Sequence, residues 1–302
     1  MISPIITVIG AAHVDQTIYL EGPVRLGRTN PASHSSIAGG VAANIARHMA
    51  SGAISLGRSG ALIQFLGVTN SEQGGSLQRD LQTVGIKARF VALAGPAPSY
   101  TAILDPDGEL VIGAACMDLY DAVTADDILP FIPKTGCVVM DANFPKVVLG
   151  AAADALPVAM SLFAAGTSVE KVRRLLPIMD RLDGLVLNRA EAAQLVADGS
   201  TAEMAQRLAV LMRPRGFVLV SDGADVAALA QDGIVVERAP QPLETTGPLK
   251  SVNGAGDAMA ARLFALYLQG ASRHRPSSDM LNDLLQDALA AGAAFAAGES
   301  NV

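Results

Sequence analysis

The chain has 302 residues and a formal net charge of −7, with 50% hydrophobic and 17% charged residues. The acidic balance argues against nucleic-acid binding, which needs a basic face, and no uninterrupted apolar run of about 20 residues predicts a membrane span. Cys116 and Cys137 offer neither a disulfide framework nor metal-ligand spacing, and no basic region precedes the first apolar residues, so we expect a cytoplasmic protein.

The first part of the chain predicts strands and helices in an irregular order. Residues 5–9 form a β-branched run that ends at Gly10 and is typical of a buried strand. Asp105-Pro106-Asp107-Gly108 is a strong turn signal between two short apolar runs, and this hairpin suggests a small sheet set apart from the main body. The other predicted elements are a helix over 41–50 that opens with Gly39-Gly40, a strand over 63–68, a helix over 74–84, and hairpin strands over 100–104 and 109–112.

From Cys137 onward, strands and helices alternate. This rhythm implies parallel βαβ units, and hence an α/β fold with a doubly wound, mostly parallel sheet flanked by helices. The predicted strands are 137–140, 158–162, 185–187 and 217–220, with a hairpin over 226–230 and 234–238. The predicted helices are 147–155, 170–179, 191–197, 202–212, 255–269 and 280–297.

Gly254-Ala255-Gly256-Asp257, at the start of the helix over 255–269, is the most informative motif. Glycines let the backbone approach a ligand closely, and a helix N-terminus attracts anions. Asp257 would repel such an anion unless it acts as a base toward an attacking hydroxyl group. The alternative is an ordinary helix start, at which Gly and Asp are both common.

Three further motifs follow predicted strands or open a predicted helix, and their order along the chain is informative. Asp15 follows the first strand, Gly39-Gly40 with Asn44 opens a helix, and Asn188-x-x-Glu191 follows a later strand. Together with Gly254–Asp257, they resemble the ribokinase-like (PfkB) family of sugar and nucleoside kinases, from Val8 to the final helices. The resemblance implies one ribokinase-like domain over 1–302 with a small β-sheet lid, whose strands lie within about 11–37 and 97–116.

The family resemblance implies ATP-dependent phosphorylation of a primary hydroxyl group. Asp257 would be the base, while the N–H groups of Ala255, Gly256 and Asp257, in the turn that Gly254 opens, would form an anion hole for the transferring phosphoryl group. Asn188 and Glu191 would position Mg²⁺ through water. The same pair also has the spacing of a helix capping box, and the two roles can coexist.

The resemblance also divides the remaining residues between two substrates. Asp15, Gly39, Gly40 and Asn44, with His13 and Thr101, would bind a sugar or nucleoside under the lid. Ser221, Asp222 and Gly223, with Asn188 and Asn253, would bind ATP. Relatives use an Asp where this chain has Ser251 to help bind an activating K⁺, so K⁺ dependence stays open. As in many relatives, we expect a homodimer through an open sheet edge of the lid.

Several stretches resemble the pseudouridine kinases within this family. They are Thr29-Asn30-Pro31 before Gly39-Gly40-Val41, the hairpin 100–109, Met117-Asp-x-Tyr120-Asp121 and Asp141-Ala-Asn143. This resemblance implies the phosphorylation of pseudouridine to pseudouridine 5′-phosphate. His13 stands where the family usually has Asn, Ala43 where pseudouridine kinases tend to have Arg, and Val220 where the nucleotide turn has its first Gly.

Two other kinds of function stay open. The chain can be a kinase for another pentose, hexose or nucleoside, or a catalytically silent sugar-binding member of the fold, which the changes at Val220 and Ser251 favour. A dinucleotide-binding dehydrogenase is excluded because residues 10–13 lack the Gly-x-Gly-x-x-Gly spacing, and no P-loop motif is present.

Overall fold

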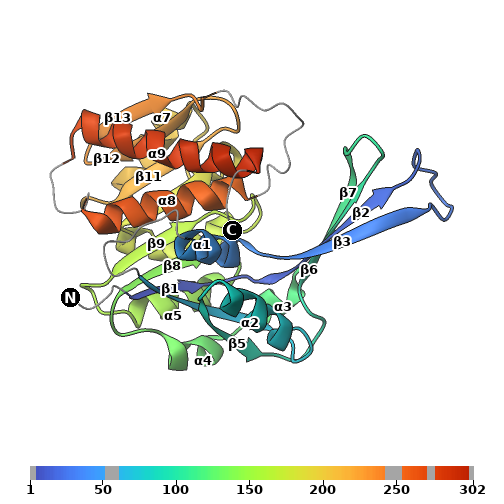
Figure 1. Cartoon of the computed structure of the whole chain (residues 1–302). Helices are drawn as coiled ribbons and strands as arrows, with labels where there is room; N and C mark the ends of the chain where they lie inside the picture. Colours follow the sequence, from blue (N-terminus) through green and yellow to red (C-terminus); the bar gives the residue numbers. More distant parts are fainter. Residues whose placement is uncertain (1–4, 52–60, 242–253, 271–275, 299–302) are drawn as a thin grey trace.

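The computed structural model describes residues 5–51, 61–241, 254–270 and 276–298, which form two sheets and the helices around them (Figure 1). The large sheet has nine strands in the order β13-β12-β11-β10-β9-β8-β1-β4-β5. In chain order these strands are β1 Ile5–Ile9, β4 Leu62–Thr69, β5 Lys87–Ala92, β8 Cys137–Asp141, β9 Ser161–Ala165, β10 Gly184–Asn188, β11 Phe217–Ser221, β12 Ala227–Gln231 and β13 Ile234–Arg238.

Seven neighbouring strands of this sheet are parallel, in the spatial order β5-β4-β1-β8-β9-β10-β11, and β12 and β13 add an antiparallel edge. The chain fills this sheet outward from β1: first β4 and β5 on one side, then β8 to β11 on the other. The strand order therefore reverses between β1 and β8. In open α/β sheets, ligands bind beyond the carboxyl ends of the strands at such a switch point.

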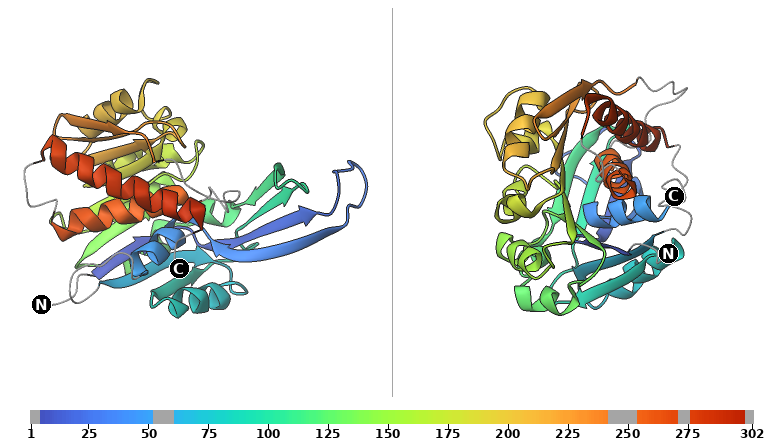
Figure 2. Two further views of the ribbon diagram at one scale, coloured as in Figure 1. Left: turned by 45° about the horizontal axis from the view of Figure 1, so that its top comes forward. Right: turned by 90° about the vertical axis from the view of Figure 1, so that its left-hand side faces the viewer.

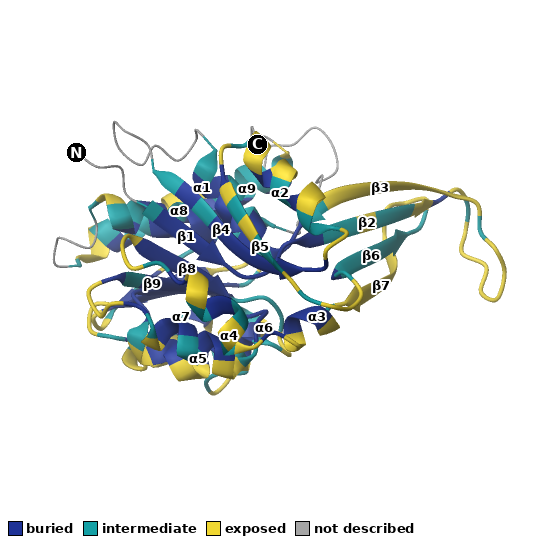
Figure 3. Ribbon diagram, turned by 90° about the horizontal axis from the view of Figure 1, so that it is seen from below, coloured by how far each residue is buried: buried dark blue, intermediate teal, exposed yellow. Residues whose placement is uncertain are grey.

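Helices cover both faces of the large sheet (Figures 2 and 3). The pattern begins in the strands: Val138 and Met140 of β8 pack into one hydrophobic core, whereas Cys137 and Val139 pack into the other. One face carries α1 Val41–Ala50, α2 Gly74–Thr83, α8 Ala255–Gln269 and α9 Ser278–Ala297. The other carries α3 Asp118–Asp121, α4 Ala125–Ile128, η1 Leu129–Phe131, α5 Lys146–Asp154, η2 Val172–Arg181, α6 Arg189–Ala192 and α7 Thr201–Val210. The expected doubly wound α/β fold is confirmed.

A second, four-stranded sheet projects from the body beside β1, and we call it the lid (Figures 1 and 2). Its order is β3-β2-β6-β7, with β2 and β6 parallel in its middle. Its strands are β2 His13–Leu20, β3 Ala32–Gly39, β6 Ser99–Leu104 and β7 Leu110–Cys116. The predicted hairpin is confirmed: Asp105 N–H donates to Glu109 O, and Gly108 has the left-handed φ of 87°.

Three predicted elements differ from the structure. The strand predicted over 158–162 starts at Ser161, because Met160 N–H closes a turn on Pro157 O. The helix predicted over 170–179 is the 3₁₀ helix η2, in which Pro177 has no N–H to donate. The helix predicted over 191–197 begins at Arg189 and ends at Ala192. Over the described residues, no helix is both long and apolar enough to cross a membrane.

Candidate active site

The motif residues meet where the carboxyl ends of β1 and β8 face the first turns of α1 and α8. The two helices lie side by side (Figure 1). Asn44 of α1 reaches Asp257 of α8. This is the edge of the sheet at which the strand order reverses. Asn44 and Asp257, far apart in the sequence, are therefore in direct contact, and Asp15 is near enough for its charge to act on Asp257.

Asp257 occupies the third position of α8 and accepts a hydrogen bond of 2.8 Å from Asn44 Nδ2 to its Oδ2. Protein atoms surround the carboxyl group densely, although part of the side chain still touches solvent. This burial is the main cause that raises the pKa of Asp257 to about 7. Asn44 opposes it, while the negative charges of Asp141, Glu191 and Asp15 add to it. A carboxyl group that titrates near neutral pH suits a general base.

The N-terminus of α8 has the geometry of an anion cradle. Gly254 caps the helix with φ 99°, and the N–H groups of Ala255, Gly256 and Asp257 have no acceptor within the helix. Among the described atoms, none lies within 4 Å of where a side chain at residue 256 would begin, so the cradle is open there. A side chain at residue 254 would press on the Phe295 ring.

Asp141, at the end of β8, fixes the other half of the site. Its buried carboxylate accepts N–H groups from Ala11 at 2.9 Å, Ala42 at 3.2 Å and Asn143 at 2.9 Å. It thus ties the end of β1 to the start of α1, where the helix cap, Gly40, has no side chain to supply an acceptor. The sequence prediction did not include Asp141 among the site residues. A carboxylate directly after a buried strand was the available signal.

His13 and Asp15 share one face of β2. His13 Nε2 lies 3.1 Å from Asp15 Oδ1, an ion-pair distance, and His13 Nδ1 lies 3.2 Å from the Tyr120 hydroxyl oxygen. Tyr120 gives its one hydroxyl hydrogen to Ala12 O, so its oxygen must accept from Nδ1–H of His13. Nε2 can then donate toward Asp15 only when the ring carries a second proton.

The side chain of Asp15 is 30% exposed, so a ligand hydroxyl group can reach its carboxylate. Its Oδ1 is buried, and no described residue gives it a hydrogen bond of acceptable geometry. Gly39 keeps this space open, because a side chain there would collide with the Asp15 carboxylate. Gly40 has φ 100°, and a side chain on it would strike the backbone of Ala11.

The structure does not bring Thr101 to this face of the lid. In the β2–β6 pair, Asp15 is opposite Tyr100, while Thr101 is opposite Gln16. Neighbouring residues of a strand point to opposite faces, so Thr101 lies on the far face from Asp15. Tyr100, one residue earlier, shares the face with Asp15. The turn signal located the hairpin but not its register.

Asn188 and Glu191 form the capping box that their spacing predicts. Glu191 N–H donates to Asn188 Oδ1 at 2.9 Å, and Asn188 N–H donates to Glu191 Oε2 at 3.0 Å. Burial raises the pKa of Glu191, although the Asn188 N–H opposes this. Gly166 faces the Glu191 carboxylate so closely that a side chain there would collide with it. The second carboxylate oxygen, Oε1, is not used by the box.

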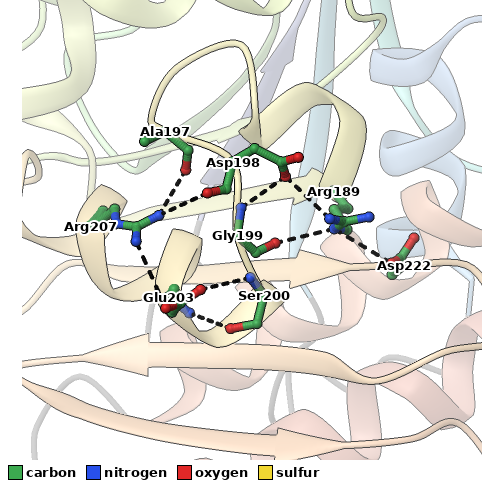
Figure 4. A network of polar contacts seen from close by, with 8 residues as sticks. All are labelled: Arg189, Ala197, Asp198, Gly199, Ser200, Glu203, Arg207 and Asp222. Atoms are coloured by element: carbon green, nitrogen blue, oxygen red, sulfur yellow. Dashed lines mark hydrogen bonds and ion pairs between the residues drawn. The ribbon is translucent and has the colours of Figure 1, made fainter.

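The predicted ATP side follows β11. Ser221 is buried with its hydroxyl 3.5 Å from Leu187 O, and Gly223 takes the left-handed φ of 57° in the turn. Asp222 lies 3.8 Å from Arg189 Nε, in a network that also contains Asp198 (Figure 4). Val220 is a buried residue inside β11, so its side chain does not disturb the turn itself. Asn253 and Ser251 lie outside the described residues.

The donors present suit a magnesium ion that keeps its water shell. Within the part of the chain that the structure describes, no three His, Cys, Asp or Glu side chains gather as a metal centre. Mg²⁺ does not need such a cluster, since it commonly binds through one or two carboxylates, water and substrate phosphates. The unused oxygen of Glu191, beside the space kept by Gly166, fits that demand.

A hollow elsewhere on the molecule contains none of these residues. It lies between the end of α7 and the β12–β13 hairpin, and Arg213, Arg215 and Asp232 are among its lining residues. This is the edge at which β11 begins, opposite the carboxyl ends that carry Asp257, Asp141 and Asp15. The chemistry-bearing groups therefore belong to the switch point and not to the hollow.

Comparison with known proteins agrees with this geometry. Residues 5–298 match the family model of the pfkB family carbohydrate kinases. The chain is 24% identical over 273 residues to pseudouridine kinase of Escherichia coli (strain K12), covering 88% of this chain and 84% of the relative. A carbohydrate kinase from Agrobacterium tumefaciens has a TM-score of 0.77 and 27% identity, with 99% of this chain and 92% of that chain covered. Ribokinase of Arabidopsis thaliana, complexed with ribose and ATP, has a TM-score of 0.73 and 20% identity, with 100% and 94% covered.

Proposed function

The chain belongs to the pfkB family of carbohydrate kinases, and on that basis we propose that it transfers the γ-phosphoryl group of ATP to pseudouridine, giving pseudouridine 5′-phosphate. The broader activity, a sugar or nucleoside kinase of the ribokinase type, follows from the family. The observation that carries the mechanism is Asp257, a carboxyl group with a pKa of about 7 at the start of α8, beside Asn44.

The proposed reaction needs little beyond positioning and charge stabilisation. The acceptor hydroxyl lies against Asp257, which takes its proton as the oxygen attacks the γ-phosphorus. The new oxygen–phosphorus bond forms as the bond from the γ-phosphorus to the bridging oxygen breaks, and ADP leaves with that oxygen. The N–H groups of Ala255, Gly256 and Asp257 stabilise the charge on the transferring group. The proton remains on Asp257 until solvent removes it.

Magnesium would be held on the nucleotide side by Glu191 and Asn188 through water. When bound, Mg²⁺ would neutralise part of the charge on the phosphate oxygens of ATP. Asn188 keeps Glu191 oriented through the capping box, so the free carboxylate oxygen has a fixed direction. Ser221, Asp222 and Gly223 would contact the nucleotide where β11 ends.

The acceptor would lie between Asp15 and Asp257. The exposed part of the Asp15 carboxylate can accept a ribose hydroxyl group, and Gly40 lets the sugar approach the backbone. Pseudouridine rests on the 24% identity to the bacterial relative and on the stretches that resemble its subfamily. Another pentose, hexose or nucleoside is the alternative acceptor, because His13 and Ala43 alter the residues around the sugar.

The deciding experiment is an ADP-release assay with purified protein, ATP, Mg²⁺ and a panel of pentoses, hexoses and nucleosides. We expect turnover with pseudouridine at a kcat/KM above that for uridine and ribose. Preference for another member of the panel would reject pseudouridine but keep the kinase. If no member of the panel causes ADP release but calorimetry shows that a sugar binds, the catalytically silent alternative would be indicated.

Three broader features are part of the proposal. Residues 1–302 act as one ribokinase-like domain, and the use of ATP favours a cytoplasmic location. Two copies would form a homodimer through their lids, which expose Ile37, Leu110 and Ile112 at 66%, 57% and 56%. Ile37 lies on β3 and Leu110 and Ile112 lie on β7, the two edge strands of the lid, and an exposed apolar edge is a surface against which a second copy can pack.

A further inference from the structure

Four side chains form a continuous row from the surface of α2 to Asp257. Asp80 of α2 binds Arg47 of α1, with 2.6 Å between Oδ2 and Nη2. Arg47 Nη1 donates to Asn44 Oδ1 at 3.1 Å, and Asn44 Nδ2 donates to Asp257 Oδ2 at 2.8 Å. Asn44 and Arg47 are three residues apart, so they lie on the same face of α1.

The row determines which way the Asn44 amide points. A guanidinium group only donates hydrogen bonds, so Arg47 must face the amide oxygen of Asn44. An ionised carboxylate only accepts, so Asp257 must face the amide nitrogen. The reversed amide would place its oxygen against the carboxylate and its NH₂ group against the guanidinium, and both contacts would be repulsive.

We propose that Arg47, held in place by Asp80, is a positioning residue of the phosphoryl-transfer site, which keeps the Asn44 amide nitrogen directed at Asp257. This inference rests on the proposed function, in which Asp257 is the base. Arg47 touches neither of the reacting groups in this scheme and acts through Asn44. Its ion pair with Asp80, whose side chain is 46% exposed, is of a kind that contributes little to stability.

The hydrogen bond from Asn44 matters because it lowers the pKa of Asp257, whereas the other groups around Asp257 raise it. Burial is the main cause that raises the pKa of Asp257, and the carboxylates of Asp141 on β8, Glu191 on α6 and Asp15 on β2 raise it further. Asn44 is the group that lowers it. A freely rotating amide would lose this effect for part of the time, so the pKa of Asp257 would rise.

The kinetic test compares Arg47→Ala and Arg47→Lys with Arg262→Ala as the matched control. Arg262 of α8 also makes a helix-to-helix ion pair, 2.9 Å from Asp287 of α9, whose side chain is about as exposed as that of Asp80. If the pKa of Asp257 rises by one unit, kcat of Arg47→Ala falls roughly fivefold at pH 7 and hardly at pH 9. We expect an unchanged KM for ATP, partial recovery in Arg47→Lys, and no such pH dependence in Arg262→Ala.

Coupling to Asn44 separates positioning from a purely structural role. In an Asn44→Ala background, Arg47→Ala should cause no further loss of kcat, because the residue through which it acts is gone. Asp80→Asn should reproduce the pH-dependent loss of Arg47→Ala in weaker form. Equal losses from Arg47→Ala in both backgrounds, or a loss that is the same at every pH, would overturn the proposal.

A final measurement needs no catalytic activity. The substitution Asp257→Asn is made in the wild-type chain and in Arg47→Ala. In each background, the increase in melting temperature that it causes is measured as a function of pH. The pH at which this gain levels off reports the pKa of Asp257, near 7 in wild type, and we expect a higher value without Arg47. The same value in both would overturn the proposal. A shift without turnover of any acceptor would leave the positioning role intact and reject the proposed kinase reaction.

Discussion

At the scale of single residues, the site combines a costly carboxylate with the groups that make it useful. Burial disfavours the charged form of Asp257 and raises its pKa. The hydrogen bond from Asn44 favours the charged form. A residue in this position is expected to work against stability, since active sites hold groups that the fold would prefer neutral.

Asp257→Asn should stabilise the protein in a pH-dependent way. The pKa of Asp257 rises from 3.8 to about 7 on folding, so the folded state binds more protons between those values and stability falls as the pH rises through them. The neutral amide escapes this loss. Its gain in melting temperature should therefore grow from pH 4 to pH 7 and then stay constant. A gain that is equal at pH 4 and pH 8 would refute the raised pKa.

His48 should show the opposite dependence. It is buried on α1 with its ring edge-on to Phe295, 5.1 Å between centroids, and burial, with a smaller effect of Arg47, lowers its pKa to about 4. The unfolded chain then binds more protons between pH 4 and 6.5, so stability rises with pH across that range. In urea unfolding, His48→Gln should remove on the order of 3 kcal/mol of this rise. An unchanged pH dependence in His48→Gln would show that His48 does not titrate in this way.

At the scale of elements, Asp141 joins a strand end to a helix start. Its carboxylate satisfies two backbone N–H groups, of Ala11 and Ala42, that would otherwise be buried without an acceptor. Replacement by alanine leaves both unsatisfied, and we expect a loss of about 2–4 kcal/mol in the free energy of unfolding. Urea unfolding would measure it.

The matched control for Asp141→Ala is Asp121→Ala. Asp121 makes an ion pair of 2.7 Å with Arg174, but its side chain is 52% exposed. Exposed pairs contribute about 1 kcal/mol or less. Similar losses in the two variants would mean that the buried hydrogen bonds of Asp141 do not hold the loop and helix together.

The elements that the sequence predicted well are those with a one-sided or fully apolar pattern. β1 and α1 have the predicted bounds, because a buried strand and an amphipathic helix each leave a clear periodicity. β3 of the lid has mostly polar and small residues that are exposed, so no periodicity marks it and only the family resemblance placed it. Thr101 lies on the face of the lid opposite to Asp15 for a related reason, since a shift of one residue in register changes the face.

At the scale of the whole molecule, the order of motifs along the chain indicated one site, and the sheet topology explains why. Asp15 and Asp257 end near each other because β1 and β8 flank the switch point, a consequence of strand order that no local pattern contains. The role of Asp141 was hidden for the same reason: the two N–H groups that tie it to the end of β1 and the start of α1 are 130 and 99 residues away.

The exposed apolar side chains of the lid lead to a prediction of the oligomeric state. Ile112 is more than half exposed on β7, and we expect a homodimer in which lids cover such side chains. Light scattering after size-exclusion chromatography should give twice the mass of the chain for the wild type and a monomer for Ile112→Asp. Val210→Asp, at an 81% exposed position on α7, should remain a dimer. A monomeric wild type at all concentrations would contradict the proposed assembly.

The central claim is that Asp257 is the base of a phosphoryl transfer, and the turnover of Asp257→Asn with the best acceptor tests it most directly. Calorimetry first establishes that this variant still binds ATP and the acceptor. We then predict that kcat falls by about 10²–10⁴-fold, the usual contribution of a general base. In the wild type, kcat should fall below pH 7, as the carboxyl group becomes protonated. An Asp257→Asn variant that keeps a rate near wild type would contradict the account.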